Sequence, residues 1–371
     1  MLKASIFKRY LLPGLVFQSV VIAGGYGTGR ELVEFFLRYG PLGGLLAMVF
    51  INTVIWSLVC AVSFELARLW RSYDYRSFCR NLLGKAWITY EACYLILMLI
   101  ILAVIAASAG SILQESFDLP YYLGVIGMMA AVGFLVFKGS STIEGFLSIW
   151  SGVLYVTYFA FFVWCFTQFG ESILSNLAAK EIKPGWIVGG AQYAAYNIGL
   201  IPPILFCVRH ITSRKEAVTA GLLAGPIGII PGVLFFLASV GQYPHIMEET
   251  VPANYLLGVL GSRPFQLVFQ VVLLGTLIET GTGLIHAFNE RVAGVFREKK
   301  AEMPLFLRPT VAVLLLVVAA VFARFGLIDL IAKGYGTITW VFWLVYVIPT
   351  LTLGVWIIAK KGRSESPRAV S

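Results

Sequence analysis

Glu279 is the residue whose position most directly suggests chemistry, because it is a single carboxylate near the middle of a long apolar run. The run reads LLGTLIETGTGLIHAFNERV, with Thr276, Thr280 and Thr282 around the glutamate and no basic residue near it in the sequence. A carboxyl group in this setting either takes a proton or ligates a cation together with hydroxyl and carbonyl oxygens. We therefore expect a coupling or binding role for Glu279. The alternative is a neutral, hydrogen-bonded structural glutamate.

A glycine-rich segment, AGGYGTGRE over residues 23–31, ends in the charged residues Arg30 and Glu31. Glycines interrupt a helix, and backbone groups freed inside a membrane need a cavity or a ligand. Charged side chains at this depth are costly and commonly mark a substrate or ion path. We expect an unwound segment that binds a ligand. The alternatives are a simple packing kink and a structural pair between Arg30 and Glu31.

A second break is expected in AAYNIGLIPP, residues 194–203, where Asn197 and Gly199 precede Pro202 and Pro203. Proline removes a backbone donor and crowds the preceding turn, so the pair interrupts a helix. Tyrosine and amide side chains gather at the two breaks, namely Tyr26, Gln192, Tyr193, Tyr196 and Asn197. Such groups suit a small polar ligand, although tyrosines also line ordinary helix interfaces.

The elements that position these residues are membrane helices. Of 371 residues 59% are hydrophobic and 13% are charged, and the mean hydropathy is +0.85. These values exclude an ordinary soluble fold and predict one membrane-embedded domain over residues 1–371. The expected spans are roughly 9–39, 41–70, 86–113, 120–137, 141–169, 185–208, 213–241, 264–296, 304–325 and 335–360.

The two breaks fall in the first helix of each group of five. Five crossings are an odd number, so the second group enters from the opposite side, giving an inverted repeat with halves of about 8–169 and 184–361. Matched broken helices in such a repeat indicate a binding site near the bilayer midplane. The polar segment 243–261 is long enough for a short outer helix that could serve as a lid.

The net charge of +9 follows membrane topology and does not indicate a nucleic-acid partner. With the N-terminus inside, most basic residues fall on expected cytoplasmic ends or loops. The exceptions are Arg30, Arg38, Lys180, Lys183, Arg263, Arg324 and Lys333. The bias predicts a multi-pass protein of the cell membrane with both termini cytoplasmic. Nothing in the sequence indicates a protein partner.

Enzyme signatures are missing from the sequence. It contains no HExxH, GxSxG or GxxxxGK[ST] motif and no clustered metal ligands, and its five cysteines are scattered without CxxC spacing. The glycine-rich segment echoes a nucleotide loop but has no strand before it. The chain is therefore not expected to be an enzyme, and no cofactor is expected.

Three segments together resemble the YkvI-type membrane proteins of the amino acid-polyamine-organocation superfamily: GGYGTGRELVEFF, the break from Asn197 to Pro203, and ETGTGLIHAFNERV. The resemblance covers nearly the whole chain. It implies an all-α LeuT-like fold of about ten transmembrane helices in a five-plus-five inverted repeat, with helices one and six discontinuous. More distantly, it suggests kinship with amino acid permeases and with the permease-like subunits of spore germinant receptors.

In LeuT-like transporters the substrate lies between the unwound parts of helices one and six, and a sodium ion often lies between helices one and eight. The expected substrate-binding residues are therefore Gly24, Gly25, Tyr26, Gly27, Thr28, Gly29, Arg30, Glu31, Tyr193, Tyr196, Asn197 and Gly199. The expected ion-coupling residues are Ala23, Gly24, Thr276, Glu279 and Thr280. Many sodium sites of this fold use small residues and hydroxyls where this chain has the carboxylate of Glu279. The coupling ion can therefore be either Na⁺ or H⁺, and no other metal is expected.

The leading expectation is a secondary active transporter, an ion-coupled symporter of a small polar or zwitterionic solute, an amino acid or related amine, that works by alternating access. The half-helix N-terminus after Gly29, together with Arg30, would attract a carboxylate. The alternative is a membrane receptor or sensor that binds a ligand without transporting it, as kinship with germinant receptors suggests.

Overall fold

The structure is a computed structural model that describes residues 6–22, 24–138, 140–298, 303–304 and 306–364. Over these residues it is nearly all helical and contains no strand. The expected all-α class is therefore confirmed.

The elements before residue 179 are η1 (Phe7–Leu11), α2 (Leu12–Val21), α3 (Gly24–Gly27), α4 (Arg30–Phe35), η2 (Leu37–Tyr39), α5 (Pro41–Leu46), η3 (Ala47–Asn52), α6 (Thr53–Trp70), α7 (Tyr75–Leu83), η4 (Gly84–Ala86), α8 (Trp87–Phe117), α9 (Tyr121–Lys138) and α10 (Ser140–Ala178).

The later elements are α11 (Trp186–Ile198), α12 (Ile201–Ile204), η5 (Leu205–His210), α13 (Arg214–Val240), η6 (His245–Glu248), α14 (Pro252–Leu260), α15 (Arg263–Glu298), α16 (Leu307–Ala323), α17 (Leu327–Asp329), η7 (Leu330–Tyr335), α18 (Gly336–Phe342), η8 (Trp343–Val347), η9 (Thr350–Gly354) and α19 (Val355–Ser364). The short helix expected within residues 243–261 is confirmed as α14, and its place on the outer side stays a prediction.

Six helical stretches in the described residues are long and apolar enough to cross a membrane. A seventh results if Trp186–Ile198 and Ile201–His210, which meet at 44°, form one span. The apolar helices Tyr121–Phe137 and Leu307–Ala323 are shorter. The expected number of ten spans therefore stays a prediction.

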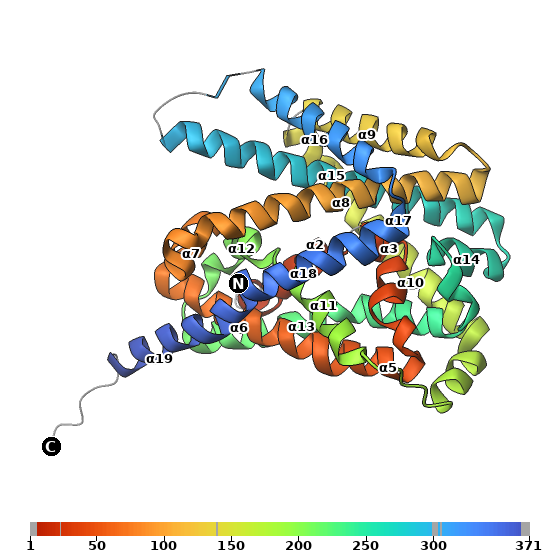
Figure 1. The fold of residues 1–371 in the computed structure, drawn as a ribbon, viewed down its shortest axis with the longest axis horizontal. Helices are drawn as coiled ribbons and strands as arrows, with labels where there is room; N and C mark the ends of the chain where they lie inside the picture. Colours follow the sequence, from red (N-terminus) through yellow and green to blue (C-terminus); the bar gives the residue numbers. More distant parts are fainter. Residues whose placement is uncertain (1–5, 23, 139, 299–302, 305, 365–371) are drawn as a thin grey trace.

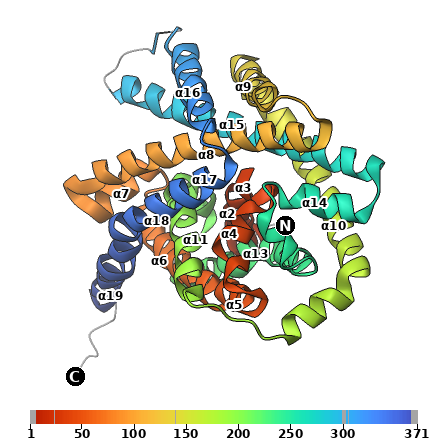
Figure 2. The same cartoon turned by 45° about the vertical axis from the view of Figure 1, so that its right-hand side comes forward.

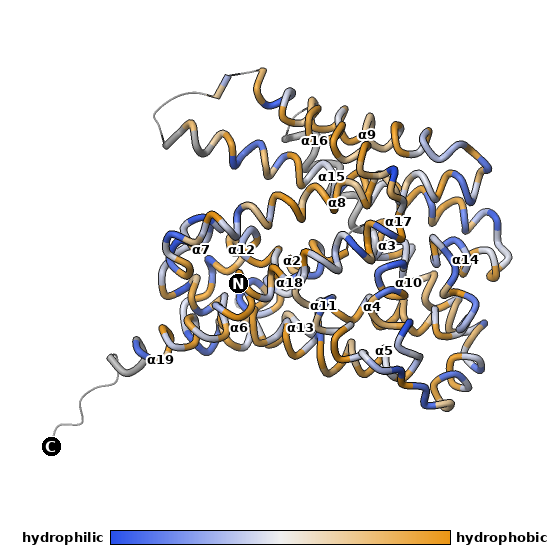
Figure 3. Tube along the Cα trace, in the orientation of Figure 1, coloured by the Kyte–Doolittle hydropathy of each residue, from blue (hydrophilic) through white to orange (hydrophobic). Residues whose placement is uncertain are grey.

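The helices run between two polar ends of the molecule. Figure 1 shows α7 and α14 at opposite ends of the long axis, and Figure 2 shows the same separation from another side. Hydrophilic residues gather near these ends, whereas the middle parts of the helices are mostly hydrophobic (Figure 3). This distribution is that of a protein whose helices cross a bilayer from one polar end to the other.

The first break separates α2 from α4 at the centre of the molecule, where other helices surround both (Figure 2). The expected unwinding of the whole segment is wrong, because the short helix α3 occupies Gly24–Gly27; among the described residues only Ile22, Thr28 and Gly29 are non-helical there. The α2 helix ends because Ile22 leaves helical geometry, with φ −75° and ψ 79°. Gly29 then takes φ +82°, a left-handed conformation that glycine adopts without strain, and α4 begins at the next residue. The glycines thus position Arg30 and Glu31 at the start of a new, separately oriented helix.

The second break separates α11 from α12. The amide of Leu200 bonds the Asn197 carbonyl at 3.0 Å, which closes a tight turn after α11. Pro202 and Pro203 then follow within the first turn of α12, where the backbone donor that proline lacks has no partner within the helix. The proline pair is therefore compatible with a new helix but not with a continuation of α11.

Side-chain donors from three neighbouring elements fix the α11 segment. The indole nitrogen of Trp56 on α6 donates to the Ala194 carbonyl at 3.1 Å, and Trp343 donates to the Ala191 carbonyl at 3.2 Å. The Tyr90 hydroxyl on α8 donates to the Gly199 carbonyl at 2.7 Å. These bonds satisfy backbone acceptors inside the protein and hold α11 in place.

Candidate functional site

The central feature is a hydrogen bond between the two broken segments. The Tyr196 hydroxyl on α11 donates to Glu31 Oε2 on α4 at 2.5 Å, and Glu31 is only 1% exposed. The backbone of Tyr26 also bonds this carboxylate. A Cβ added at Gly25 would lie 2.2 Å from Glu31 Oε1, so only glycine permits this close approach. The structure thus brings Gly25, Tyr26, Glu31 and Tyr196 together.

Aromatic rings enclose this carboxylate. The ring of Tyr335, on η7, stacks on Tyr196 with centroids 4.5 Å apart and planes 10° apart. Tyr193 meets Tyr196 edge to face at 5.5 Å and 84°. Trp56 and Phe36 lie against Tyr193 at 5.8 and 4.8 Å. The site therefore combines one buried carboxylate with a wall of tyrosines.

Two fully enclosed tyrosine hydroxyls in this region, those of Tyr26 and Tyr193, have no hydrogen-bond partner among the described residues. The Tyr26 hydroxyl lies 3.1 Å from the position a Cβ would take at Gly232 on α13. The Tyr158 hydroxyl, by contrast, donates to the Gly27 carbonyl at 3.1 Å and satisfies part of the break. Unpartnered buried hydroxyls are unusual and indicate groups that could bind a ligand or water.

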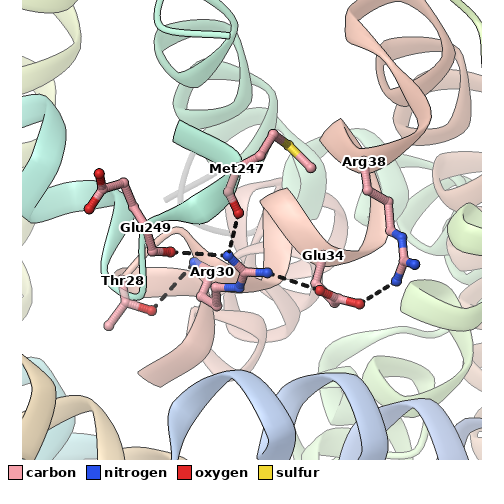
Figure 4. A network of polar contacts seen from close by, with 6 residues as sticks. All are labelled: Thr28, Arg30, Glu34, Arg38, Met247 and Glu249. Atoms are coloured by element: carbon pink, nitrogen blue, oxygen red, sulfur yellow. Dashed lines mark hydrogen bonds and ion pairs between the residues drawn. The ribbon is translucent and has the colours of Figure 1, made fainter. Parts of the chain in front are cut away.

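Arg30 binds a different part of the molecule (Figure 4). Its Nη1 donates to the carbonyls of Met247 and Glu249, both at 3.0 Å, and its Nη2 donates to Glu34 at 3.1 Å. Glu34 also accepts a hydrogen bond from Arg38. Arg30 does not pair with Glu31, so a structural pair between them is wrong. Arg30 instead holds the segment before α14 against α4.

Further contacts bind the same segment to the first break. The amide of Ala253 on α14 donates to the Thr28 carbonyl at 3.0 Å, and the Thr28 hydroxyl donates to the Gly25 carbonyl at 2.9 Å. Gly29 faces Phe235 and Pro252, which would lie 2.3 and 3.2 Å from an added Cβ. We call residues 243–261 the lid, because they cover the α4 side of the break.

A cavity of about 430 Å³ lies on the other side of the break, alongside α2. Three of the expected ion-coupling residues, Thr276, Glu279 and Thr280, line it together. The cavity also reaches Ile22 and Leu200, which lie at the two helix breaks. Ala23, expected to share this site, lies outside the described residues, and Gly24 begins α3 beside it.

A second cavity of about 310 Å³ adjoins the first and shares Tyr94, Pro203 and Ala287 with it. Its lining includes Asp74 and Arg291, near the polar end that holds α7. Arg291 forms an ion pair with Glu91 and a hydrogen bond with the Tyr75 hydroxyl. The two cavities thus lie side by side between the helix breaks and the polar end that holds α7.

Two expected substrate-binding residues have structural partners instead. The Asn197 amide donates to the Tyr193 carbonyl at 2.9 Å within α11. The Gly199 carbonyl accepts from Tyr90, and an added Cβ there would lie 2.6 Å from the Phe342 ring. The remaining expected residues lie around the first break and Tyr196, and their binding roles stay predictions.

The sequence interpretation missed Tyr335 and Tyr155. Tyr335 stacks on Tyr196, and Tyr155 lines the cavity beside Glu279 and donates to Gln18 at 3.2 Å. Tyr155 lies in an apolar run, where only its aromatic type could have marked it, whereas the glycines on either side of Tyr335 were a signal that the sequence interpretation did not use. No group of three or more metal-ligating side chains occurs in the described part of the chain, and all five cysteines are buried and free.

The fold is shared with solved membrane transporters. MhsT in complex with L-phenylalanine matches with a TM-score of 0.59 and 16% identity, covering 93% of this chain and 96% of MhsT. A Na⁺-coupled sialic acid symporter matches with a TM-score of 0.53 and 13% identity, covering 93% of this chain and 84% of the symporter. Inward-facing Mhp1 matches with a TM-score of 0.52 and 12% identity, covering 91% of this chain and 75% of Mhp1. The expected LeuT-like fold is confirmed. These neighbours are transporters and not enzymes.

The resemblance to YkvI is also confirmed. Membrane protein YkvI of Bacillus subtilis (strain 168) is 22% identical over 289 residues, which cover 75% of this chain and 79% of YkvI. The chain matches no known family profile. It is a helical membrane protein with the fold of ion-coupled transporters.

Proposed function

We propose that the protein is an ion-coupled symporter of the cell membrane that moves a small polar or zwitterionic solute, an amino acid or related amine, by alternating access. The observation that carries this proposal is the asymmetry about the first break. On the α4 side the lid is bonded to Arg30 and Thr28, whereas on the α2 side one cavity reaches Ile22 at the break and a second cavity adjoins it.

This asymmetry is what one half of a transport cycle requires. Alternating access needs a central site that is closed toward one polar end and reachable from the other. With both termini cytoplasmic, as the charge bias predicts, the reachable side is the cytoplasmic one. Movement of the lid away from the first break would require release of the hydrogen bonds from Arg30 to Met247 and Glu249 and from Ala253 to Thr28. The Asn254 side chain bonds Glu115 and Gln270 as well.

Glu279 is the proposed coupling residue. It lines the cavity between α2 and α15 with two hydroxyl residues, Thr276 and Thr280. Their hydroxyls donate to backbone carbonyls one turn earlier, at 2.9 and 3.0 Å, which leaves their lone pairs able to face a cation. A carboxylate with hydroxyl oxygens can bind Na⁺, and the same carboxylate can carry H⁺.

Reconstitution into liposomes tests the proposal. A panel of labelled amino acids and amines is supplied under an inward Na⁺ gradient, an inward H⁺ gradient or neither, and uptake is measured for the wild type and for Glu279→Gln. Glu171→Gln, at an exposed position on α10, is the matched control. Gradient-driven accumulation that Glu279→Gln abolishes and Glu171→Gln retains supports the proposal.

The opposite outcomes are equally clear. If no solute moves under either gradient, transport is rejected. Saturable binding without uptake would then favour the receptor or sensor function. If accumulation occurs and Glu279→Gln behaves like the wild type, the chain is a transporter whose coupling residue lies elsewhere.

A further inference from the structure

The carboxylate of Glu31 has no basic partner in the part of the chain that the structure describes. Its neighbour Arg30 pairs with Glu34, and the groups that contact Glu31 are the Tyr196 hydroxyl and the Tyr26 backbone. A buried carboxylate is strongly disfavoured unless a positive charge or several donors compensate it. A carboxylate accepts about four hydrogen bonds, and the two donors here leave part of that capacity unused.

The surroundings of Glu31 suit an organic cation. Four phenol groups lie close enough to interact electrostatically with it, those of Tyr26, Tyr193, Tyr196 and Tyr335. Aromatic rings attract cations through their negative faces, and a cluster of such rings with a carboxylate is a recurrent site for ammonium groups. The stacked pair Tyr196 and Tyr335 provides a rigid part of this wall.

We propose that Glu31 binds the ammonium group of an organic amine, with the rings of Tyr193, Tyr196 and Tyr335 around it. This assignment rests on the proposed transport function and narrows its substrate class to amines. The ammonium group supplies the positive charge that no described residue places beside Glu31. The ammonium group donates to the Glu31 carboxylate either in place of the Tyr196 hydroxyl or together with it.

The hydroxyls of Tyr26 and Tyr193 define a second requirement of the ligand. Both are enclosed and unpartnered. An amine that carries a hydroxyl or carbonyl oxygen a few bonds from its nitrogen can satisfy one of them. The preferred ligand is therefore a polar amine, and a purely aliphatic amine binds more weakly.

The ligand reaches this site from the cavity beside α2. That cavity is lined by Ile22 and Leu200, and Ile22 stands three residues before Gly25 and four before Tyr26, at one end of the break. Entry requires the Glu31 side chain to move away from Gly25, where its Oε1 now lies. Because Gly25 has no Cβ, the backbone leaves room for such movement.

Binding to the purified full-length protein in detergent tests the proposal without any need for transport. The probes are butylamine, 4-aminobutan-1-ol, butan-1-ol and butyrate, and affinity is measured by calorimetry. The wild type is expected to bind both amines, the amino alcohol more tightly, and to bind the alcohol and the acid weakly. Glu31→Gln, which keeps the size of the side chain, should weaken amine binding roughly tenfold to hundredfold.

Three further variants make the test specific. Glu171→Gln, at an exposed position on α10, should retain wild-type affinity. Tyr335→Leu should weaken amine binding severalfold, and Tyr335→Phe should largely restore it because the ring is kept. If Glu31→Gln does not fold, as judged by its elution and thermal unfolding, the Tyr335 pair still decides the matter.

The proposal is overturned if the neutral alcohol binds as tightly as the amines. It is equally overturned if amine affinity is unchanged in Glu31→Gln, which would leave Glu31 as a proton carrier or a structural group. Failure of transport gives a different pattern: Glu31-dependent amine binding with no uptake under either gradient would retain the amine site and reject the symporter. Gradient-driven uptake that does not depend on Glu31 would retain the symporter and reject the amine site.

Discussion

Arg30 and Glu31 are adjacent in the sequence but bind different elements: Arg30 bonds the lid carbonyls of Met247 and Glu249, and Glu31 bonds Tyr196 on α11. The start of α4 therefore connects the outer cover of the site with its interior. Movement of α4 alters both sets of contacts, since both side chains extend from its first turn. This arrangement offers a direct route by which occupancy near Glu31 can affect closure of the lid.

Arg30→Gln is expected to loosen the lid. The change removes two hydrogen bonds from a charged donor to carbonyls, each worth about 1.5–3 kcal/mol, and it also removes the pair with Glu34. Amides in residues 245–260 should exchange hydrogen roughly tenfold faster or more, as measured by mass spectrometry. Arg38→Gln is the control, because Arg38 is half exposed and contacts Glu34 but not the lid. Equal exchange in the two variants would show that Arg30 does not hold the lid.

Gly29→Ala should destabilise the protein by more than backbone strain alone. The left-handed φ of +82° costs an alanine about 1–2 kcal/mol, and its Cβ would also lie 2.3 Å from the Phe235 ring. Gly261→Ala is the matched control, because its φ is +74° and nothing lies within 4 Å of the added Cβ. Thermal unfolding in detergent should show the larger decrease for Gly29→Ala. Similar decreases would mean that the Phe235 ring moves aside.

Gly225→Ala is expected to disturb the contact between α13 and α6. An added Cβ would lie 2.2 Å from the Ser57 hydroxyl and 2.6 Å from the Thr53 carbonyl. Such overpacking costs about 1–3 kcal/mol, and the apparent Tm should fall. Gly127→Ala on α9, where an added Cβ meets nothing within 4 Å, should leave the Tm unchanged or raise it slightly. A Tm unaffected by Gly225→Ala would contradict the close approach of the two helices.

Glu91→Gln should destabilise the polar end near α7. It leaves the guanidinium of Arg291 without its carboxylate partner, in a place where both side chains are less than one-fifth exposed, at 17% and 18%. We expect a loss of about 1–3 kcal/mol, seen as a lower Tm and faster proteolysis. The corresponding change in an exposed pair, Asp329→Asn opposite Lys333, should cost no more than about 1 kcal/mol. Equal effects would indicate that the Glu91 pair is solvated.

The sequence signals for an interrupted backbone at residues 23–31 and 194–203, and for the lid helix, are local. The glycines before Arg30 and the proline pair after Leu200 each determine what their own backbone can do, and α2 and α11 end beside them. The coupling or binding role expected of Glu279 rests on an equally local signal, a lone carboxylate among hydroxyl residues in an apolar run. Local chemistry of this kind needs no knowledge of the tertiary structure.

The partners of the charged residues could not be predicted in the same way. Glu31 and Tyr196 are 165 positions apart, and the Arg30 acceptors are backbone carbonyls of the lid, 217 and 219 positions away. A carbonyl carries no side-chain signal in a sequence. Tyr335 stands between Gly334 and Gly336, and its place beside Tyr196 depends on how distant helices pack. The number of spans and the two-half repeat also stay predictions.

Trp56 gives the protein an optical reporter near its proposed site. It is the one fully buried tryptophan among those whose side chains the structure describes, and its ring lies 5.8 Å from Tyr193, which in turn contacts Tyr196. The emission of an indole depends on the polarity and motion of the groups around it. Displacement of Tyr193 by an arriving solute would therefore alter the fluorescence of Trp56, so occupancy can be followed in real time without attaching a dye.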